Sequence, residues 1–234
     1  MNNIAPQVCP AIIVMAKVPQ AGEVKTRLRP FLSGEQAAML AVCFLQDTIF
    51  NVKNLAENVI VAFTPPDGIE ILKDILPTDL ILIEQDGSDL SERLEAVIEY
   101  AASRKFSPII IIGADSPTLP FEFIQKAIDV FKNKTDAALG ATRDGGFYLI
   151  GLRGKHPGLF ENVAWSSSLV FGQTRANVER LELSLFRLPD WYDIDTADDL
   201  IFLRGKMLDD KELQVRAPRT FQWLLSNSEL FDSI

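Results

Sequence analysis

Histidine is almost absent from this sequence of 234 residues, because His156 is the only one. Ser-His-Asp and Cys-His catalysis would both depend on this single residue, which lies in a turn-like segment and is expected at the surface. A zinc site rich in histidine cannot be built. The two cysteines, Cys9 and Cys43, show no metal-ligand spacing, and we expect both to be reduced thiols. The chemistry that remains is that of carboxylates, lysine, arginine and hard metal ions.

Basic residues are scarce relative to acidic ones. Lysine and arginine number 23 against 32 aspartates and glutamates, which gives a formal net charge of −9. This balance argues against nonspecific binding to nucleic acid or to an anionic membrane surface. No apolar run approaches the roughly 18 residues of a membrane span, and residues 1–6 carry no basic segment typical of a signal peptide. We therefore expect an unprocessed cytoplasmic protein that binds neither nucleic acid nor membrane, with its oligomeric state left open.

The apolar runs alternate with helical patterns along the first half of the chain. The strands that we expect there are 11–16, 59–63, 80–83 and 109–112. The helices that we expect there begin at the Ser33 capping box, near Asp89 and near Phe121. This succession predicts a parallel sheet with right-handed crossovers.

In the second half the regular alternation of strands and helices stops, and this half is expected to extend the same sheet with mixed strand directions. Its predicted strands are 137–141, 147–152 and 185–188, and its predicted helices are 196–207 and 218–225. A chain of this length with 47% hydrophobic residues is most simply one large domain.

The segment Gly113–Pro117 follows the wholly apolar run 108–112. Such a run is typical of a central strand buried on both faces, and ligands of open α/β sheets bind just outside the carboxyl ends of the strands. A carboxylate placed there needs a cation or several hydrogen-bond donors. Asp115 is therefore predicted to be either a metal ligand or the cap of the helix that begins near Pro120.

A loop rich in basic residues, 17–30, follows the first predicted strand. Gly22 would let the backbone approach a ligand, while Lys25 and Arg27 could neutralise phosphate oxygens. The Walker A spacing is absent. We expect a phosphate-binding loop, and the alternative is an ordinary solvated loop.

A second acidic cluster, 193–199, precedes a predicted helix. Thr196 and Asp199 fit a capping box, which leaves Asp193 and Asp195 unexplained by capping. Asp115 and Asp195 together would suit Mg²⁺, which typically takes one or two protein carboxylates along with water and phosphate oxygens. The sequence assigns no role to Asp193.

Three further candidates carry weaker signals. Asp144, Gly145 and Gly146 predict either a hairpin turn or a place where backbone amides and a carboxylate touch a substrate. The turn before the helix near residue 90 offers Asp89 as a cap and Arg93 as a possible ligand contact. Trp165 would supply an aromatic wall for a sugar or would simply be part of the core.

The motifs occur in an order that resembles a known bacterial family. They are Pro19-x-x-Gly22-x-x-Lys25-Thr26-Arg27-Leu28, 113–117, 144–151, Trp165-Ser166 and 193–196. This pattern resembles the radical-SAM/selenodomain-associated transferases, a glycosyltransferase-A-like group. The resemblance implies a nucleotide-diphospho-sugar transferase fold, which is a Rossmann-like three-layer α/β/α structure with a mixed sheet.

The resemblance also implies how the chain is divided and what it binds. A nucleotide-binding half would span about 8–118, an acceptor-binding half about 119–204, and a C-terminal helical extension 205–234. A divalent metal, Mg²⁺ or Mn²⁺, would be held by Asp115 and Asp195. Nucleotide and substrate contacts would come from the residues named above: Pro19, Gly22, Lys25, Thr26, Arg27, Asp89, Arg93, Asp144, Gly145, Gly146 and Trp165.

The segment from the first strand to Leu28 is also similar to phospholactate guanylyltransferases, in which the corresponding basic loop holds a nucleoside triphosphate. Gly113 stands where many glycosyltransferases of this fold have the first Asp of an Asp-x-Asp motif, and Phe147 stands where the family usually has Tyr. The leading hypothesis is a metal-dependent transferase that uses a nucleotide sugar and a small-molecule acceptor, with Lys25, Arg27 and Asp115 as catalytic residues. The alternatives are a nucleotidyltransferase that releases pyrophosphate and a non-catalytic nucleotide-sensing module.

Overall fold

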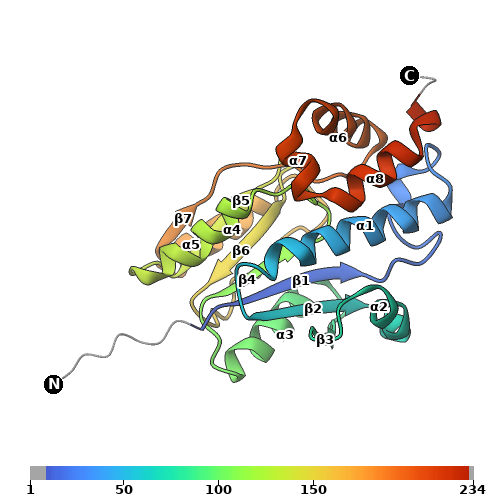
Figure 1. The fold of residues 1–234 in the computed structure, drawn as a ribbon. Helices are drawn as coiled ribbons and strands as arrows, with labels where there is room; N and C mark the ends of the chain where they lie inside the picture. The colour runs from blue at the N-terminus through green and yellow to red at the C-terminus, as the bar shows by residue number, and fades with distance from the viewer. Residues whose placement is uncertain (1–8, 232–234) are drawn as a thin grey trace.

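A sheet of seven strands runs through the computed structural model, which describes residues 9–231 (Figure 1). The strand order is β3-β2-β1-β4-β6-β5-β7. The strands are β1 (Ala11–Lys17), β2 (Asn58–Thr64), β3 (Ile81–Glu84), β4 (Ile109–Gly113), β5 (Ala137–Ala141), β6 (Phe147–Leu152) and β7 (Leu185–Arg187). The first four are parallel, whereas β6 is antiparallel to both β4 and β5. The predicted parallel first half and mixed extension are therefore confirmed, while the prediction for residues 1–6 lies outside the described residues.

Helices cover both faces of this sheet. The helices are α1 (Gly34–Val52), α2 (Ile69–Ile75), α3 (Leu90–Ser103), α4 (Phe121–Asp129), α5 (Val170–Arg180), α6 (Ala197–Asp209), α7 (Lys211–Arg216) and α8 (Pro218–Ser226). The 3₁₀ turns are η1 (Thr26–Leu28), η2 (Pro66–Gly68), η3 (Val130–Lys132) and η4 (Ser228–Phe231). On β1, Ile12 and Val14 pack with α1, α2 and α4, whereas Ile13 points to the core under α3 and α5. The three-layer α/β/α fold with a mixed sheet is confirmed.

The helix caps that the sequence predicted from neighbouring residues are confirmed. The side chains of Ser33 and Thr196 each accept a hydrogen bond in a capping box, and Asp89 caps α3. The alternative that Asp115 caps α4 is wrong, because the N-cap is Pro120 and no side chain bonds there.

Three helices were not predicted from the sequence: α2, α5 and α7. The reason is clearest in α5, where only Val170, Thr174 and Val178 are buried. This single narrow stripe includes a threonine, so the apolar periodicity that marks longer helices is weak.

The C-terminal helices α6, α7 and α8 stack over α1 on one side of the sheet (Figure 1). Asp47 of α1, fully buried, accepts hydrogen bonds from the backbone N–H groups of Arg219 (3.2 Å) and Thr220 (2.8 Å) in the first turn of α8. A carboxylate from one helix thus serves the unpaired N–H groups of another. Burial raises the pKa of Asp47, and the bonds from Thr220 and Arg219 act in the opposite direction.

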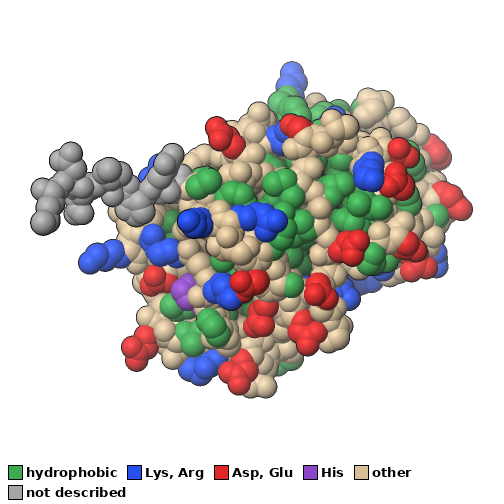
Figure 2. Space-filling model, turned by 90° about the horizontal axis from the view of Figure 1, so that it is seen from below, with side chains coloured by type: hydrophobic (Ala, Val, Ile, Leu, Met, Phe, Trp, Pro, Cys, Tyr) green, Lys and Arg blue, Asp and Glu red, His purple; other side chains and the backbone are tan. Residues whose placement is uncertain are grey.

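Acidic and basic side chains are interspersed on the face seen in Figure 2, which bears no continuous basic surface. Within residues 9–231, no helix has the length and apolar character needed to cross a membrane.

Asp47→Ala should destabilise the protein by about 2–3 kcal/mol, because it leaves buried N–H donors at the start of α8 without acceptors. Urea unfolding followed by circular dichroism measures this change. Asp79→Ala is the control: Asp79 forms an exposed ion pair with Lys53, and its removal should have a clearly smaller effect. Equal losses in the two variants would contradict the capping role of Asp47.

Candidate active site

The carboxyl ends of β1 and β4 lie side by side at the centre of the sheet. The chain leaves β1 toward β2 on one side, while β4 continues the sheet on the other, so the strand order reverses between them. Such a switch point opens a crevice in which α/β proteins bind ligands. The loop 17–30 follows β1, and Asp115 lies two residues beyond β4.

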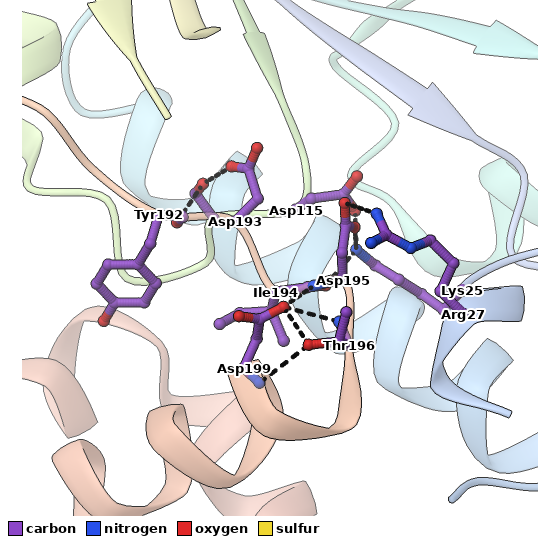
Figure 3. A network of polar contacts seen from close by, with 10 residues as sticks. Lys25, Arg27, Asp115, Tyr192, Asp193, Ile194, Asp195, Thr196 and Asp199 are labelled. Atoms are coloured by element: carbon purple, nitrogen blue, oxygen red, sulfur yellow. Dashed lines mark hydrogen bonds and ion pairs between the residues drawn. The ribbon is translucent and has the colours of Figure 1, made fainter. Parts of the chain in front are cut away.

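The ammonium group of Lys25 joins three segments at this crevice (Figure 3). Its Nζ lies 2.6 Å from Oδ1 of Asp115 and 3.2 Å from Oδ1 of Asp195, and it donates to the carbonyl of Ile194 at 2.7 Å. The Lys25 side chain is only 6% exposed, so these oxygens replace the water that the charge has lost. The two predicted metal ligands therefore share one buried lysine.

Burial acts to lower the pKa of Lys25, but the charges of Asp115 and Asp195 outweigh it, so the pKa is raised. A raised pKa means that the folded state favours the charged amine. The ion pairs therefore contribute their full stability below the ordinary lysine pKa of 10.5 and lose it as the pH rises through the folded value. Lys25 also adopts a left-handed backbone conformation (φ 48°), and its side chain is buried whereas the neighbouring Thr26 and Arg27 are exposed.

Asp193 is a third carboxylate beside this pair. Burial raises its pKa to about 7, a hydrogen bond with Ser116 acts to lower it, and the charges of Asp115 and Asp195 raise it further. The Ser116 hydroxyl contacts both Asp193 and the carbonyl of Tyr192. Asp193 therefore ties the segment before α6 to the loop after β4.

A cavity of about 250 Å³ opens next to Lys25. It is lined by the end of β1, by Lys25, Thr26 and Arg27, and by Asp115 and Asp195. Arg27 is largely exposed and approaches Oδ2 of Asp195 at 3.4 Å. The basic loop and the two carboxylates thus share one opening.

Asp115 and Asp195 fit a hard divalent cation. Both offer carboxylate oxygens, and Asp115 remains 52% exposed, so one of its oxygens can face a ligand. Across residues 9–231, no group of three or more His, Cys, Asp or Glu side chains is arranged to hold a metal. A cation here would depend on these two carboxylates together with water or phosphate oxygens.

A second cavity, of about 650 Å³, lies on the other side of Arg27 and Asp195. Asp144, Gly146, Phe147 and Trp165 line it, together with residues 166–168. The hairpin between β5 and β6 supplies the first three, as the Asp-Gly-Gly sequence predicted. Gly145 has a positive φ (93°), and a Cβ there would lie 2.2 Å from the carbonyl oxygen of Ser168, so this glycine lets the two loops meet.

The other predicted contacts lie away from both cavities. Pro19 is buried, and Gly22 packs near Arg29 and the start of α1. The Asp89 side chain is engaged in capping α3, and Arg93 donates to the carbonyl of Gly87 at 3.0 Å. These four residues shape the loops and do not line the openings.

The sequence did not point to Arg143, whose guanidinium lies 5.4 and 5.5 Å from the ring centroids of Tyr192 and Phe202. Together with Asp144 and Asp199, these residues line a third cavity, also of about 250 Å³, to which Arg27 contributes as well. Arg143 immediately precedes the predicted Asp-Gly-Gly turn, and this position was the one feature of the sequence that could have suggested a place for Arg143 in the site.

Lys25→Met should destabilise the protein by about 1–3 kcal/mol at neutral pH, because it leaves neighbouring carboxylates without their cation while both remain partly exposed. We expect millimolar Mg²⁺ to raise the melting temperature of this variant more than that of the wild type. Lys53→Met, which removes a surface ion pair, is the control. If Mg²⁺ had the same effect on all three proteins, the carboxylate pair would not be a cation site.

Gly145→Ala should cost about 1–3 kcal/mol, because it combines a positive φ with a clash against the carbonyl of Ser168. Gly172→Ala lies on the exposed face of α5 with open space around it and should be neutral or slightly stabilising. Thermal unfolding of the two variants provides the measurement. A stable Gly145→Ala protein would mean that the two loops separate easily.

Comparison with known proteins gives relatives of two kinds. The chain is 29% identical over 110 residues to 2-phospho-L-lactate guanylyltransferase from Methanobrevibacter smithii, covering 47% of this chain and 48% of the relative. It is 27% identical over 142 residues to the enzyme of the same name from Methanocaldococcus jannaschii, covering 61% and 60%. The chain thus spans about half the length of the curated relatives that it matches.

A solved structure from Desulfovibrio desulfuricans G20, assigned as a nucleotide-diphospho-sugar transferase, is similar over nearly its full length. It is 30% identical with a TM-score of 0.87, and the match covers 96% of this chain and 97% of the other. A family model described as "uncharacterized protein conserved in bacteria (DUF2064)" matches residues 50–167. That segment runs from the end of α1 through Asp115 to Trp165 and covers half of the sequence, and the chain therefore belongs to this family.

Proposed function

We propose that this protein is a divalent-metal-dependent transferase that uses a nucleotide phosphate compound as its donor. The observation that carries the proposal is the buried ammonium of Lys25 between Asp115 and Asp195, beside Arg27, at the switch point of the sheet. In a protein of net negative charge, two cationic side chains and two partly exposed carboxylates lie together at the place where α/β folds bind nucleotides. Similarity to guanylyltransferases and to an assigned nucleotide-diphospho-sugar transferase supports the same class.

Each residue has a role in this proposal. Arg27, which is exposed, contacts donor phosphate oxygens, for which its planar guanidinium is well suited. Lys25 is held in place by its carboxylate partners and adds positive charge to the same opening. Asp115 and Asp195 would hold Mg²⁺ or Mn²⁺, which when bound neutralises charge on phosphate groups. Such transfers depend on positioning and electrostatics, so a chain with one histidine can perform them.

Nucleotidyl transfer is the first candidate reaction. An acceptor oxygen would form a bond to the α-phosphorus of a nucleoside triphosphate, the bond from that phosphorus to the bridging oxygen would break, and pyrophosphate would leave. The curated relatives carry the name of such an enzyme. Gly113, which stands in place of the first Asp of an Asp-x-Asp motif, also favours this reaction.

Glycosyl transfer is the second candidate, favoured by the larger cavity with its aromatic and hydroxyl lining and by the similarity over the full chain to the Desulfovibrio structure. In this reaction an acceptor oxygen attacks the anomeric carbon and a nucleoside diphosphate leaves. The leaving group therefore separates the two reactions.

The first test is thermal stabilisation by nucleoside triphosphates and nucleotide sugars, each with and without Mg²⁺ or Mn²⁺. A ligand at 100 times its Kd adds about 2.7 kcal/mol to the stability of the native state. We expect a metal-dependent rise in melting temperature that Asp115→Asn abolishes while the fold stays intact. Asp190→Asn, which removes an exposed carboxylate paired with Arg187, is the matched control and should behave as wild type.

If Asp115→Asn kept the same metal-dependent rise in melting temperature, the assignment of the donor site would be wrong. Release of pyrophosphate or of nucleoside diphosphate from the stabilising donor then identifies the reaction. Binding without turnover over a broad acceptor panel would instead support a nucleotide-sensing module.

A further inference from the structure

The two main cavities of the site meet at a single ion pair. Arg27 and Asp195 line both the 250 Å³ cavity beside Lys25 and the 650 Å³ cavity beside Trp165. If the donor phosphates occupy the first, the second is the space from which another molecule reaches them. This placement rests on the proposed function and makes the larger cavity the acceptor compartment.

The charges that line the larger cavity are unbalanced. In the protein without donor or metal, Arg27 and Asp195 are paired with each other at 3.4 Å, which leaves Asp144 as the remaining charge. Within residues 9–231, no lysine, arginine or histidine lies within ion-pair distance of Asp144. An anionic group entering this compartment would therefore meet an uncompensated carboxylate, and like charges repel at short range.

Asp144 is fixed so that it can accept a hydrogen bond from a ligand. Its Oδ1 accepts hydrogen bonds from the Thr142 hydroxyl (2.5 Å) and from the backbone N–H of Gly146 (3.1 Å). In the described part of the chain, no hydrogen bond occupies its Oδ2. A carboxylate held through one oxygen offers the other to a hydroxyl donor.

The walls of the compartment suit a compound with carbon faces and hydroxyl groups. The indole of Trp165 packs edge-on against Phe147, with ring centroids 6.2 Å apart, and its Nε1 donates to Ser91 at 2.8 Å, so the ring is fixed. Ser166 and Ser168 contribute hydroxyl groups that can both donate and accept hydrogen bonds, whereas the Ser167 hydroxyl is engaged with the backbone of Ala164 and Leu169. An aromatic wall with a few polar groups is the usual composition of a small-molecule site.

We propose that the acceptor bound between Asp144 and Trp165 is a polyhydroxylated compound without an anionic group, such as a sugar or a polyol. The curated relatives carry in their name a phosphorylated carboxylic acid, 2-phospho-L-lactate. The unpaired Asp144 makes a compound of that kind a poor ligand for this compartment. The chain would thus share a donor site with those relatives and differ from them in its acceptor.

Saturation-transfer difference NMR tests this proposal without any donor. The probes are glucose, glucosamine and glucuronate, which share one ring and differ in charge, together with glycerol and glycerol 3-phosphate. Ser168→Trp fills the compartment, so only signals that this variant loses are assigned to it. Asp190→Asn serves as the control for Asp144→Asn.

We expect transfer to glucose or glycerol to exceed transfer to its anionic counterpart by about threefold or more in the wild type, because of repulsion by Asp144. Asp144→Asn should narrow this difference, and Asp190→Asn should not. Strongest transfer to an anionic probe would overturn the proposal, whereas transfer to glucosamine at or above the level of glucose agrees with the unpaired carboxylate of Asp144. The absence of transfer to every neutral probe, or signals that survive in Ser168→Trp, would also overturn it.

The change in melting temperature caused by nucleotides, measured on the same wild-type sample, distinguishes failure of the acceptor proposal from failure of the proposed donor site. Nucleotide binding without neutral-probe binding would remove the acceptor assignment alone. Neutral-probe binding without nucleotide binding would support the compartment as a polyol site and would remove the proposed donor chemistry.

Discussion

The buried ammonium of Lys25 is the contact on which the site depends. It bonds to carboxylates from the end of β4 and from the segment before α6, and to the carbonyl of Ile194. A backbone bond from the Ile194 N–H to the Asp115 carbonyl, at 2.9 Å, closes the same junction. The Lys25 side chain is only 6% exposed, so separating its charge from these partners would cost several kcal/mol of free energy. The ammonium group therefore holds three distant segments in one arrangement.

The loop after β1 is held by hydrophobic packing as well as by the ion pairs of Lys25. Leu28, at the end of η1, is fully buried in a cluster with Phe44 of α1, Ile194, and residues of the C-terminal helices such as Trp223. The C-terminal helices α6, α7 and α8 thus form one wall of the core beneath the basic loop. Asp47 completes this wall by binding the first turn of α8. The site is positioned by packing on one side and by the sheet on the other.

The features that the sequence predicted are those encoded locally. The apolar β-branched run before Asp115 indicated a buried strand, and Thr196 with Asp199 formed the expected capping box. Asp115 follows the end of β4, where α/β sheets bind ligands, as the sequence predicted. Asp195 does not follow a strand directly, and it reaches the same lysine through the segment before α6, whose Ile194 N–H donates to the Asp115 carbonyl. The pairing of Lys25 itself could not be foreseen, because it requires a left-handed backbone at a residue 170 positions from Asp195. The capping role of Asp47 could not be predicted either, because in the sequence it is simply one polar residue of an amphipathic helix.

The cluster around Leu28 has a consequence for the order of events during synthesis. The four parallel strands and α1 are complete by Gly113, so much of the sheet can form while the ribosome is still translating. The loop that carries Lys25 and Arg27, however, packs against residues between Ile194 and Phe231, which are translated after all seven strands. A nascent chain therefore has its scaffold before its basic loop is fixed, and we expect binding that needs this loop to wait until α6, α7 and α8 have docked.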